Sequence, residues 1–289
     1  MDIRAIFMGL AFVLMWSSAF TSARVIVAEA SPLYSLALRF LISGFIGVAI
    51  ALWLGQSWKL TRNQWRATII FGLCQNALYL GLNFVAMQTI EAGLASIIAS
   101  TMPLLVALAT WLILRERLPL MGILGLLGGL VGVVIIMGAR INAGVDLFGV
   151  TLAGIGCAAL ALATLSLRGA TSGGNFMMVV GLQMLVGAFA LFAVAVFVET
   201  PHMNPTWPLA IAFAYTTLVP GLLATFVWVL LVDRIGAVRA ATFHFLNPFF
   251  GVAIAAVLLG EHLGPRDILG VGIIAVSILA VQLSRTKKA

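Results

Sequence analysis

The stretch MPLLVALATWLILRERLPLMGILG at residues 102–125 returns as NPFFGVAIAAVLLGEHLGPRDILG at residues 247–270. The two copies share seven identities over 24 ungapped positions, and a proline, a glutamate and a glycine are among them. The copies lie 145 residues apart in a chain of 289 residues. This spacing predicts two related halves, at residues 1–140 and 146–285.

The composition indicates that both halves lie in a membrane. Hydrophobic residues make up 63% of the chain and charged residues 9%, whereas soluble domains carry about 25% charged residues. Mean hydropathy is +1.17. These values exclude a soluble enzyme, a disordered protein and a secreted disulfide scaffold. The apolar runs are continuous rather than alternating, which excludes an outer-membrane barrel.

Ten apolar segments approach the length of about 20 residues that a helix needs to cross a bilayer. We expect spans near residues 5–23, 33–54, 67–87, 92–114, 120–138, 147–167, 176–198, 208–232, 238–259 and 266–283. Each half then holds five spans, and because five is odd the second half enters the membrane from the opposite side. The sequence therefore predicts an all-α membrane protein with ten transmembrane helices in two inverted five-helix repeats, a plan common among secondary transporters.

The basic residues orient this arrangement. The net charge is +7, but the Lys and Arg side chains lie between apolar runs, so we expect no nucleic-acid partner. With the N-terminus inside, twelve basic residues fall in inside segments and three in outside loops. Cytoplasmic loops are rich in Lys and Arg, so both termini are expected in the cytoplasm.

Three motifs carry a family resemblance. They are Trp16-Ser17-Ser18-Ala19-Phe20 in the first span, Arg39-Phe40 in the second, and the pattern from Pro248 to Gly260-Glu261. Together they resemble the ten-span EamA-type members of the drug/metabolite transporter superfamily. The first half departs from the pattern, with Arg115 where glycine is usual before the glutamate. The resemblance implies efflux of small metabolites by alternating access at the bacterial inner membrane. Amino-acid exporters, including the aromatic amino-acid branch, are the most similar members.

The third span is rich in polar residues. Gln75, Asn76, Tyr79 and Asn83 lie at i, i+1, i+4 and i+8, which places them on one face of an α-helix. Polar groups inside a membrane tend to face a cavity or a neighbouring helix. We expect this face to line a substrate cavity, and the alternative is hydrogen bonding between helices.

Other spans contribute further candidate substrate-binding residues. Trp16 and Ser17 lie in the first span, Trp228 in the eighth, and His244 and Asn247 in the ninth. Aromatic side chains at this depth can stack on a solute. Pro103 and Pro248 lie at matching places in the fourth and ninth spans, where a proline frees a carbonyl and bends the helix. We expect both prolines to act as hinges beside the cavity.

Three charged residues are expected to be structural. Arg39 is the cation placed deepest in a span, and anchoring is favoured over binding of a substrate carboxylate. Glu116 and Glu261 precede the fifth and tenth spans, where a carboxylate suits the positive end of the following helix. No acid lies at the centre of a span, so uniport, exchange, or coupling through His244 all stay open.

Three function classes compete. A secondary transporter of small molecules is favoured, and the alternatives are a passive channel and an intramembrane enzyme. The few titratable residues in spans form no catalytic cluster, and the sequence contains no phosphate-binding loop or zinc-ligand spacing. We therefore expect no enzymatic activity, cofactor or metal, and a monomer would suffice for transport.

Overall fold

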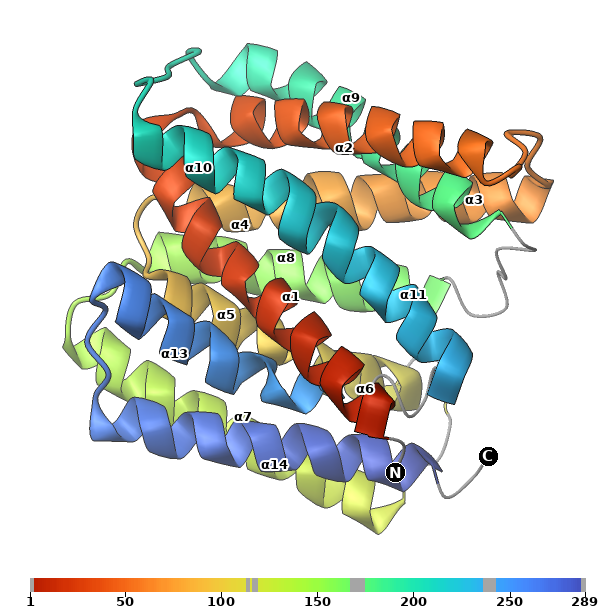
Figure 1. Cartoon of the computed structure of the whole chain (residues 1–289). Coiled ribbons are helices and arrows are strands. Elements are labelled where there is room, and N and C mark those ends of the chain that lie inside the picture. The colour runs from red at the N-terminus through yellow and green to blue at the C-terminus, as the bar shows by residue number, and fades with distance from the viewer. Residues whose placement is uncertain (1–2, 113–114, 116–118, 167–174, 236–242, 287–289) are drawn as a thin grey trace.

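The computed structural model describes residues 3–112, 115, 119–166, 175–235 and 243–286, and these form a bundle of helices (Figure 1). In chain order the elements are α1 (Ile3–Glu29), α2 (Pro32–Trp53), α3 (Arg62–Phe71), η1 (Gly72–Tyr79), α4 (Leu80–Ala86), α5 (Ala92–Ser100), α6 (Met102–Leu112), α7 (Leu120–Asn142), α8 (Leu147–Ser166), α9 (Phe176–Val198), α10 (Trp207–Thr216), η2 (Thr217–Leu223), α11 (Ala224–Ile235), η3 (Phe243–Leu246), α13 (Asn247–Leu259) and α14 (Pro265–Thr286). Elements η1 and η2 are π-helical, and η3 is a 3₁₀-helix.

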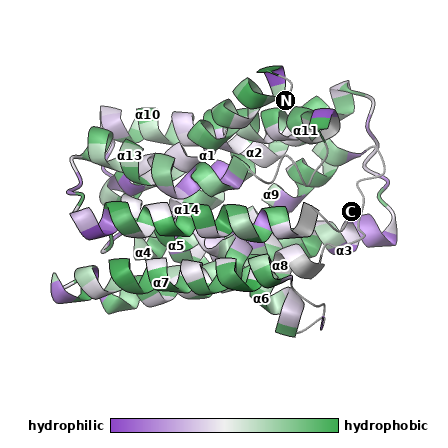
Figure 2. Cartoon of the chain, turned by 90° about the horizontal axis from the view of Figure 1, so that it is seen from below, coloured by the Kyte–Doolittle hydropathy of each residue, from purple (hydrophilic) through white to green (hydrophobic). Residues whose placement is uncertain are grey.

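The lengths of these helices confirm an all-helical membrane protein. Over the described residues, eight helical stretches are long and apolar enough to cross a membrane, and two shorter apolar helices cover Leu147–Leu162 and Phe243–Leu259. Hydrophilic residues gather at the ends of the bundle and apolar residues cover the lengths of the helices (Figure 2). Helix α1 begins and α14 ends at the same end of the bundle (Figure 1).

The third membrane-crossing stretch begins five residues earlier than hydropathy indicates. Thr61 forms a capping box with Gln64, in which each side chain accepts a hydrogen bond from the other residue's backbone N–H. This reciprocal pairing satisfies donors that the first turn of a helix leaves free. It lets α3 start at Arg62, in a polar segment with no hydrophobic signal.

Two pairs of helices make the most extensive contacts in the bundle, α2 with α9 and α7 with α14. Glycines allow the helices of each pair to approach closely. A methyl group on Gly47 would lie 3.1 Å from the Cα atom of Gly181, and one on Gly132 would lie 3.0 Å from the carbonyl oxygen of Gly270. Small residues at such crossings bring backbones together where lipid supplies no hydrophobic driving force.

The contact between α7 and α14 is reciprocal. A methyl group on Gly125 would lie 2.9 Å from the carbonyl oxygen of Ser277, and Gly132 meets Gly270. Gly125 and Gly270 are 145 residues apart, and so are Gly132 and Ser277. Each position therefore contacts the counterpart of the other, which is the pattern of a two-fold related pair.

One end of the bundle, here called the acidic end, is closed by carboxylates that bind the starts of helices. The acidic end is defined by Glu29, Glu91, Asp146, Glu199, Glu261 and Asp267. Glu199 accepts hydrogen bonds from the backbone N–H of Leu33 in α2, at 3.0 and 3.1 Å. Glu261 accepts from Ala92 at 2.7 Å and from Gly93 at 2.8 Å, in α5. The first turn of a helix has unpaired N–H groups and a partial positive charge, so each carboxylate ties one helix to another.

Glu261 binds a different helix from the one expected from the sequence. Glu261 caps α5 rather than α14, the helix that follows it. The start of α14 is bound instead by Asp267, which accepts from the N–H of Gly264 at 3.0 Å. The counterpart Glu116 lies outside the described residues.

We predict that Gly132→Leu lowers the stability of the folded protein and Gly138→Leu does not. Both glycines lie in α7, but a methyl group on Gly132 would meet Ile274 at 2.8 Å, whereas Gly138 has open space around it. Overpacking of this kind costs about 1–3 kcal/mol. Thermal unfolding of the purified variants in detergent measures the difference, and equal midpoints would contradict the close approach of α7 and α14.

Candidate functional site

A small internal cavity of about 50 Å³ lies between α1, α2, the α3–η1–α4 stretch and η2. Four of the predicted site residues line it: Trp16, Gln75, Tyr79 and Asn83. Arg39 also lines it, with Pro220 of η2 and the apolar residues Ala19, Phe20, Ala23, Leu80, Phe84 and Met87. A cavity of about 50 Å³ holds at most a few water molecules, so in this structure the site is too small to hold a metabolite.

Two π-helical turns border this cavity. Element η1 begins at Gly72 and η2 at Thr217, 145 residues apart. In η2 the backbone nitrogen of Pro220 carries no hydrogen, so regular α-helical pairing is lost there. At the end of η1 the carbonyl oxygen of Tyr79 accepts a hydrogen bond from the side chain of Asn83 in α4, at 2.8 Å. Such turns occur frequently at functional sites.

Tyr79 and Asn83 are buried, with 5% and 1% of their surfaces exposed. The amide nitrogen of Asn83 is bound to Tyr79, but its amide oxygen Oδ1 has no hydrogen-bond partner in the described part of the chain. A buried acceptor without a partner is unfavourable. Asn83 therefore offers a free hydrogen-bond acceptor beside the cavity.

Asn76 lies apart from the cavity that its neighbour Gln75 lines. Its Nδ2 atom donates to the carbonyl oxygen of Gln183 in α9 at 3.0 Å, and a methyl group on Gly187 would collide with its Cβ atom. Asn76 thus holds η1 against α9. The structure differs here from the cavity position expected for Asn76, because the π-helical turn changes how side chains point along the helix.

Trp228, His244 and Asn247 lie in an aromatic cluster next to the cavity and do not line it. The ring centroid of Phe12 lies 4.8 Å from that of Trp228 and 5.2 Å from that of His244. The Asn247 amide contacts Nδ1 of His244 at 2.9 Å. Phe12 sits at the centre of this cluster, and an apolar residue on an apolar helix gives no sequence signal.

Trp16 connects the aromatic cluster to the cavity. Its ring centroid lies 5.7 Å from that of Phe12, while another part of the side chain lines the cavity. The adjacent Ser17 is fully buried, and its hydroxyl donates to the carbonyl oxygen of Asn247 at 3.4 Å. The first span therefore contacts both groups of predicted site residues.

Both predicted hinge prolines lie at breaks between helices. Helix α5 ends at Ser100 and α6 begins at Met102, directly before Pro103. The 3₁₀ turn η3 ends at Leu246, and α13 begins at Asn247, directly before Pro248. Proline is well tolerated in the first turn of a helix, where its missing N–H is not needed. Each proline therefore lies at an interruption within a longer apolar helical stretch, Ala92–Leu112 for Pro103 and Phe243–Leu259 for Pro248, and the role of both as hinges stays a prediction.

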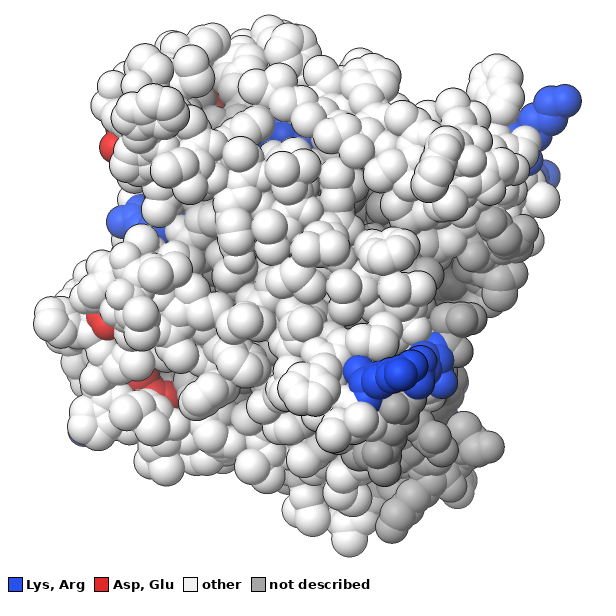
Figure 3. Space-filling view, in the orientation of Figure 1, with Lys and Arg blue, Asp and Glu red and all other residues white. Residues whose placement is uncertain are grey.

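Most charged side chains on the face seen in Figure 3 lie toward the ends of the bundle. At the acidic end Arg140 binds Glu91 at 2.5 Å and Asp267 at 3.0 Å. Burial raises the pKa of Glu261, while a hydrogen bond from the Thr89 hydroxyl lowers the pKa of Asp146. Among the described residues, no three His, Cys, Asp or Glu side chains converge to hold a metal ion.

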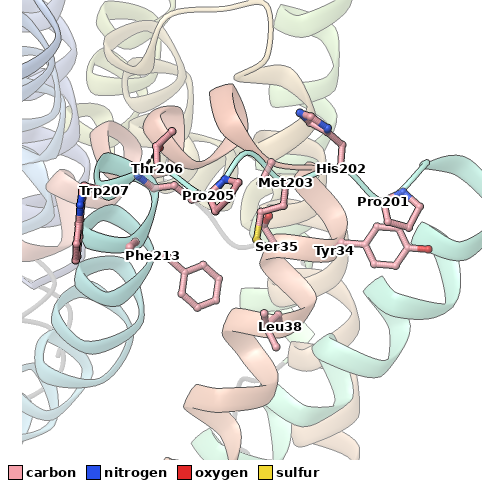
Figure 4. A pocket seen from close by; sticks show the side chains of 13 residues that line it. Tyr34, Ser35, Leu38, Pro201, His202, Met203, Pro205, Thr206, Trp207 and Phe213 are labelled. Carbon is pink, nitrogen blue, oxygen red and sulfur yellow. Dashed lines mark hydrogen bonds between the residues drawn. The ribbon is translucent and has the colours of Figure 1, made fainter.

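A larger hollow of about 690 Å³ lies on the outside of the bundle at the acidic end. Tyr34 and Leu38 of α2 line one side of it and Trp207 and Phe213 of α10 the other (Figure 4). Its lining is mostly apolar and well exposed, with 82% of Trp207 accessible. No polar side chain among the described residues that line it is buried, so the internal cavity is the better candidate for a solute site.

The chain is similar to several curated transporters along nearly its whole length. It is 27% identical over 279 residues to the uncharacterized transporter YvbV of Bacillus subtilis (strain 168), covering 96% of this chain and 91% of that protein. It is 25% identical over 292 residues to the uncharacterized transporter sll0355 of Synechocystis sp., covering 92% and 86%. A protein of known crystal structure shares the fold, with a TM-score of 0.67, 20% identity and full coverage of both chains.

A family model matches the chain twice. The EamA-like transporter family matches residues 3–138 and again residues 147–283. Two matches of nearly equal length leave only a short connection and the two termini outside the family pattern. The all-helical bundle and the named relatives agree with this assignment, so the chain belongs to the EamA-like transporter family and is a membrane transporter.

Proposed function

We propose that this transporter is a secondary exporter of small metabolites that works by alternating access through the internal cavity. Amino acids are the proposed substrates, with aromatic and other apolar amino acids preferred. The protein lies in a bacterial inner membrane as ten spans in two inverted five-helix repeats, with both termini in the cytoplasm. It needs no cofactor and has no enzymatic activity.

The observation that carries this proposal is a small cavity at which several polar side chains meet inside a largely apolar bundle. Gln75, Tyr79 and Asn83 line it together with Trp16. Lipid supplies no hydrogen bonds, so polar residues at this depth are explained by a solute or water that enters from an aqueous side. The neutral amides and the aromatic rings suit a small molecule with both polar and apolar parts.

The arrangement of the halves supports alternating access. The family model matches each half separately, η1 and η2 start 145 residues apart, and the α7–α14 contact is reciprocal. In inverted-repeat transporters one repeat moves against the other around a fixed site. Carboxylates such as Glu261, which bind helices of the other half at the acidic end, would release them when that side opens.

The two alternatives have weaker support. A channel needs a continuous path across the bundle, whereas the cavity offers only about 50 Å³ of space. An intramembrane enzyme needs reactive groups at one depth. His244 lies among aromatic rings, where Phe12 and Trp228 are its ring neighbours, and the described residues that line the cavity include no carboxylate.

Counterflow in proteoliposomes tests the proposed function. Vesicles containing the purified protein are loaded with unlabelled L-phenylalanine, L-leucine or L-serine, and uptake of the same labelled amino acid is followed. We expect transient accumulation of label that is strongest for phenylalanine. Accumulation in a channel would not exceed equilibrium, and absence of flux for all three amino acids would contradict the proposal.

Adjacent residues in η1 provide a matched pair of variants. We predict that Gln75→Ala reduces counterflow at least fivefold with little change in stability, because its side chain lines the cavity. Asn76→Ala should instead lower stability by about 1 kcal/mol, because it removes a buried hydrogen bond to α9. Counterflow and thermal unfolding are measured on both variants, and the reverse pattern would refute this division of roles.

The proposed orientation is tested by cysteine labelling in intact cells. Cys74 and Cys157 are first replaced by alanine, and Ala143→Cys or Lys59→Cys is then introduced at exposed positions at opposite ends of the bundle. We expect a membrane-impermeant maleimide to label position 143 from outside and position 59 only after the cells are permeabilised. Labelling of position 59 in intact cells would show that the protein has the opposite orientation in the membrane.

A further inference from the structure

Arg39 is a buried cation in the middle of the bundle. It lies seven residues into α2, which places it about 10 Å along the helix from its start. Only 6% of its surface is exposed. Its guanidinium carbon lies 4.8 Å from the ring centroid of Phe40, and the side chain lines the internal cavity. A side chain buried to this extent is not exposed at the membrane surface, as a snorkelling arginine would be.

The guanidinium group has no ionic partner. Within the described parts of the chain, no hydrogen bond or salt bridge is formed by Arg39, and its Nε atom is buried without a partner. The residues that line the cavity include no Asp or Glu. A charge inside a membrane is costly and normally pairs with another group. Arg39 therefore lacks the negatively charged partner that a buried cation normally has, and an anion could fill that place.

The surroundings of Arg39 contain further polar atoms without partners. The hydroxyl of Ser43, one helical turn away, and the Oδ1 atom of Asn83 are both buried and unpaired. A methyl group on Gly221 would lie 3.6 Å from Oγ of Ser43 and 3.9 Å from Nη2 of Arg39. Because Gly221 has no side chain, no atom of this residue blocks the approach of a ligand to the guanidinium from the side of η2.

We propose that Arg39 binds the carboxylate of the transported solute, and that the substrates are small monocarboxylates with an apolar or aromatic body. This deepens the proposed function and rests on it. It also reverses the structural role expected for Arg39 from the sequence. The planar guanidinium donates two parallel hydrogen bonds to a carboxylate, while Trp16, Phe20 and Phe84 provide apolar surface for the rest of the molecule.

A carboxylate fits this site better than a phosphate. One arginine supplies a single positive charge, which neutralises a monocarboxylate completely. A phosphate dianion would keep a net negative charge, and the cavity-lining residues that the structure describes include no second Lys or Arg. A zwitterionic amino acid adds an ammonium group, for which the free Oδ1 of Asn83 is an acceptor.

Two matched ligand pairs test the inference on the wild-type protein. The first pair is 3-phenylpropanoate and 3-phenylpropanamide, and the second is L-phenylalanine and L-phenylalaninamide. Each amide keeps the shape of the acid and removes the negative charge. Titration of tryptophan fluorescence in detergent should show about 10- to 100-fold tighter binding of the acid in each pair. Equal binding within both pairs, or no binding of any ligand, overturns the proposal.

Variants of Arg39 then assign the effect to this residue. Arg39→Gln should remove the preference for the acids, and Arg39→Lys should restore part of it, because lysine keeps the charge without the planar fork. The control is Arg66→Gln, which removes one exposed positive charge from α3 and should bind like the wild type. A retained preference in a folded Arg39→Gln protein contradicts the assignment. Where that variant does not fold, the ligand pairs on the wild type decide.

Counterflow with the same four solutes separates this inference from the proposed function. If the acids bind preferentially but none crosses the vesicle membrane, the transport proposal fails and the role of Arg39 stands. If the amides are exchanged as fast as the acids, the transporter stands and the role of Arg39 is refuted. Exchange of the acids alone supports both.

Discussion

Every polar group that this chain carries into the membrane needs a partner inside the protein, because lipid offers none. Most hydroxyl groups meet this need within their own helix. Thr216 and Thr217, for example, donate to carbonyl oxygens four residues back at 2.6 and 2.7 Å. Among the described residues, the buried atoms that stay unpaired include Nε of Arg39, Oγ of Ser43 and Oδ1 of Asn83, which lie at or beside one small cavity. Other unpaired atoms, such as Oγ of Ser96 and Oδ1 of Asn247, belong to residues that do not line it. The cavity is therefore distinguished by the combination of an unpaired cation with an unpaired hydroxyl and an unpaired amide oxygen.

The same constraint organises the acidic end. Helix starts expose N–H groups that need acceptors, and carboxylates from distant parts of the chain supply them. Glu199 binds the start of α2, Glu261 binds the start of α5, and Arg140 holds Glu91 and Asp267 together. These contacts join segments from both halves, and each is a short-range interaction that can break as a unit. An end closed by discrete ionic and capping contacts can exist in two states, whereas a tightly packed apolar core deforms little.

Much of this fold could be predicted from the sequence because hydropathy and chain length determine which segments cross a membrane. Where the structure describes them, the apolar segments fall on eight helical stretches long enough to cross a membrane and two shorter helices, and Gln75, Tyr79 and Asn83 lie together at one cavity. The position of Asn76 could not be predicted, since a π-helical turn changes the direction of successive side chains and leaves no clear mark in η1. The role of Arg39 was equally hidden. Its spacing from the helix end suggests an anchor, and only its burial and lack of partners in three dimensions indicate a binding group.

The backbone of the two halves is more alike than their chemistry. The π-helical turns start 145 residues apart and the α7–α14 contact is reciprocal, yet the position 145 residues after Arg39 is Met184. Methionine binds no anion, so the charge of the cavity comes from the first half alone. In the proposed alternating-access cycle, the symmetry of the halves supplies the movement, because related halves can exchange conformations at similar energy. Specificity requires asymmetry between the halves, because a single group must recognise one end of the solute. A cation on α2 without a counterpart on α9 fixes the orientation of an anionic solute while the bundle around it changes shape.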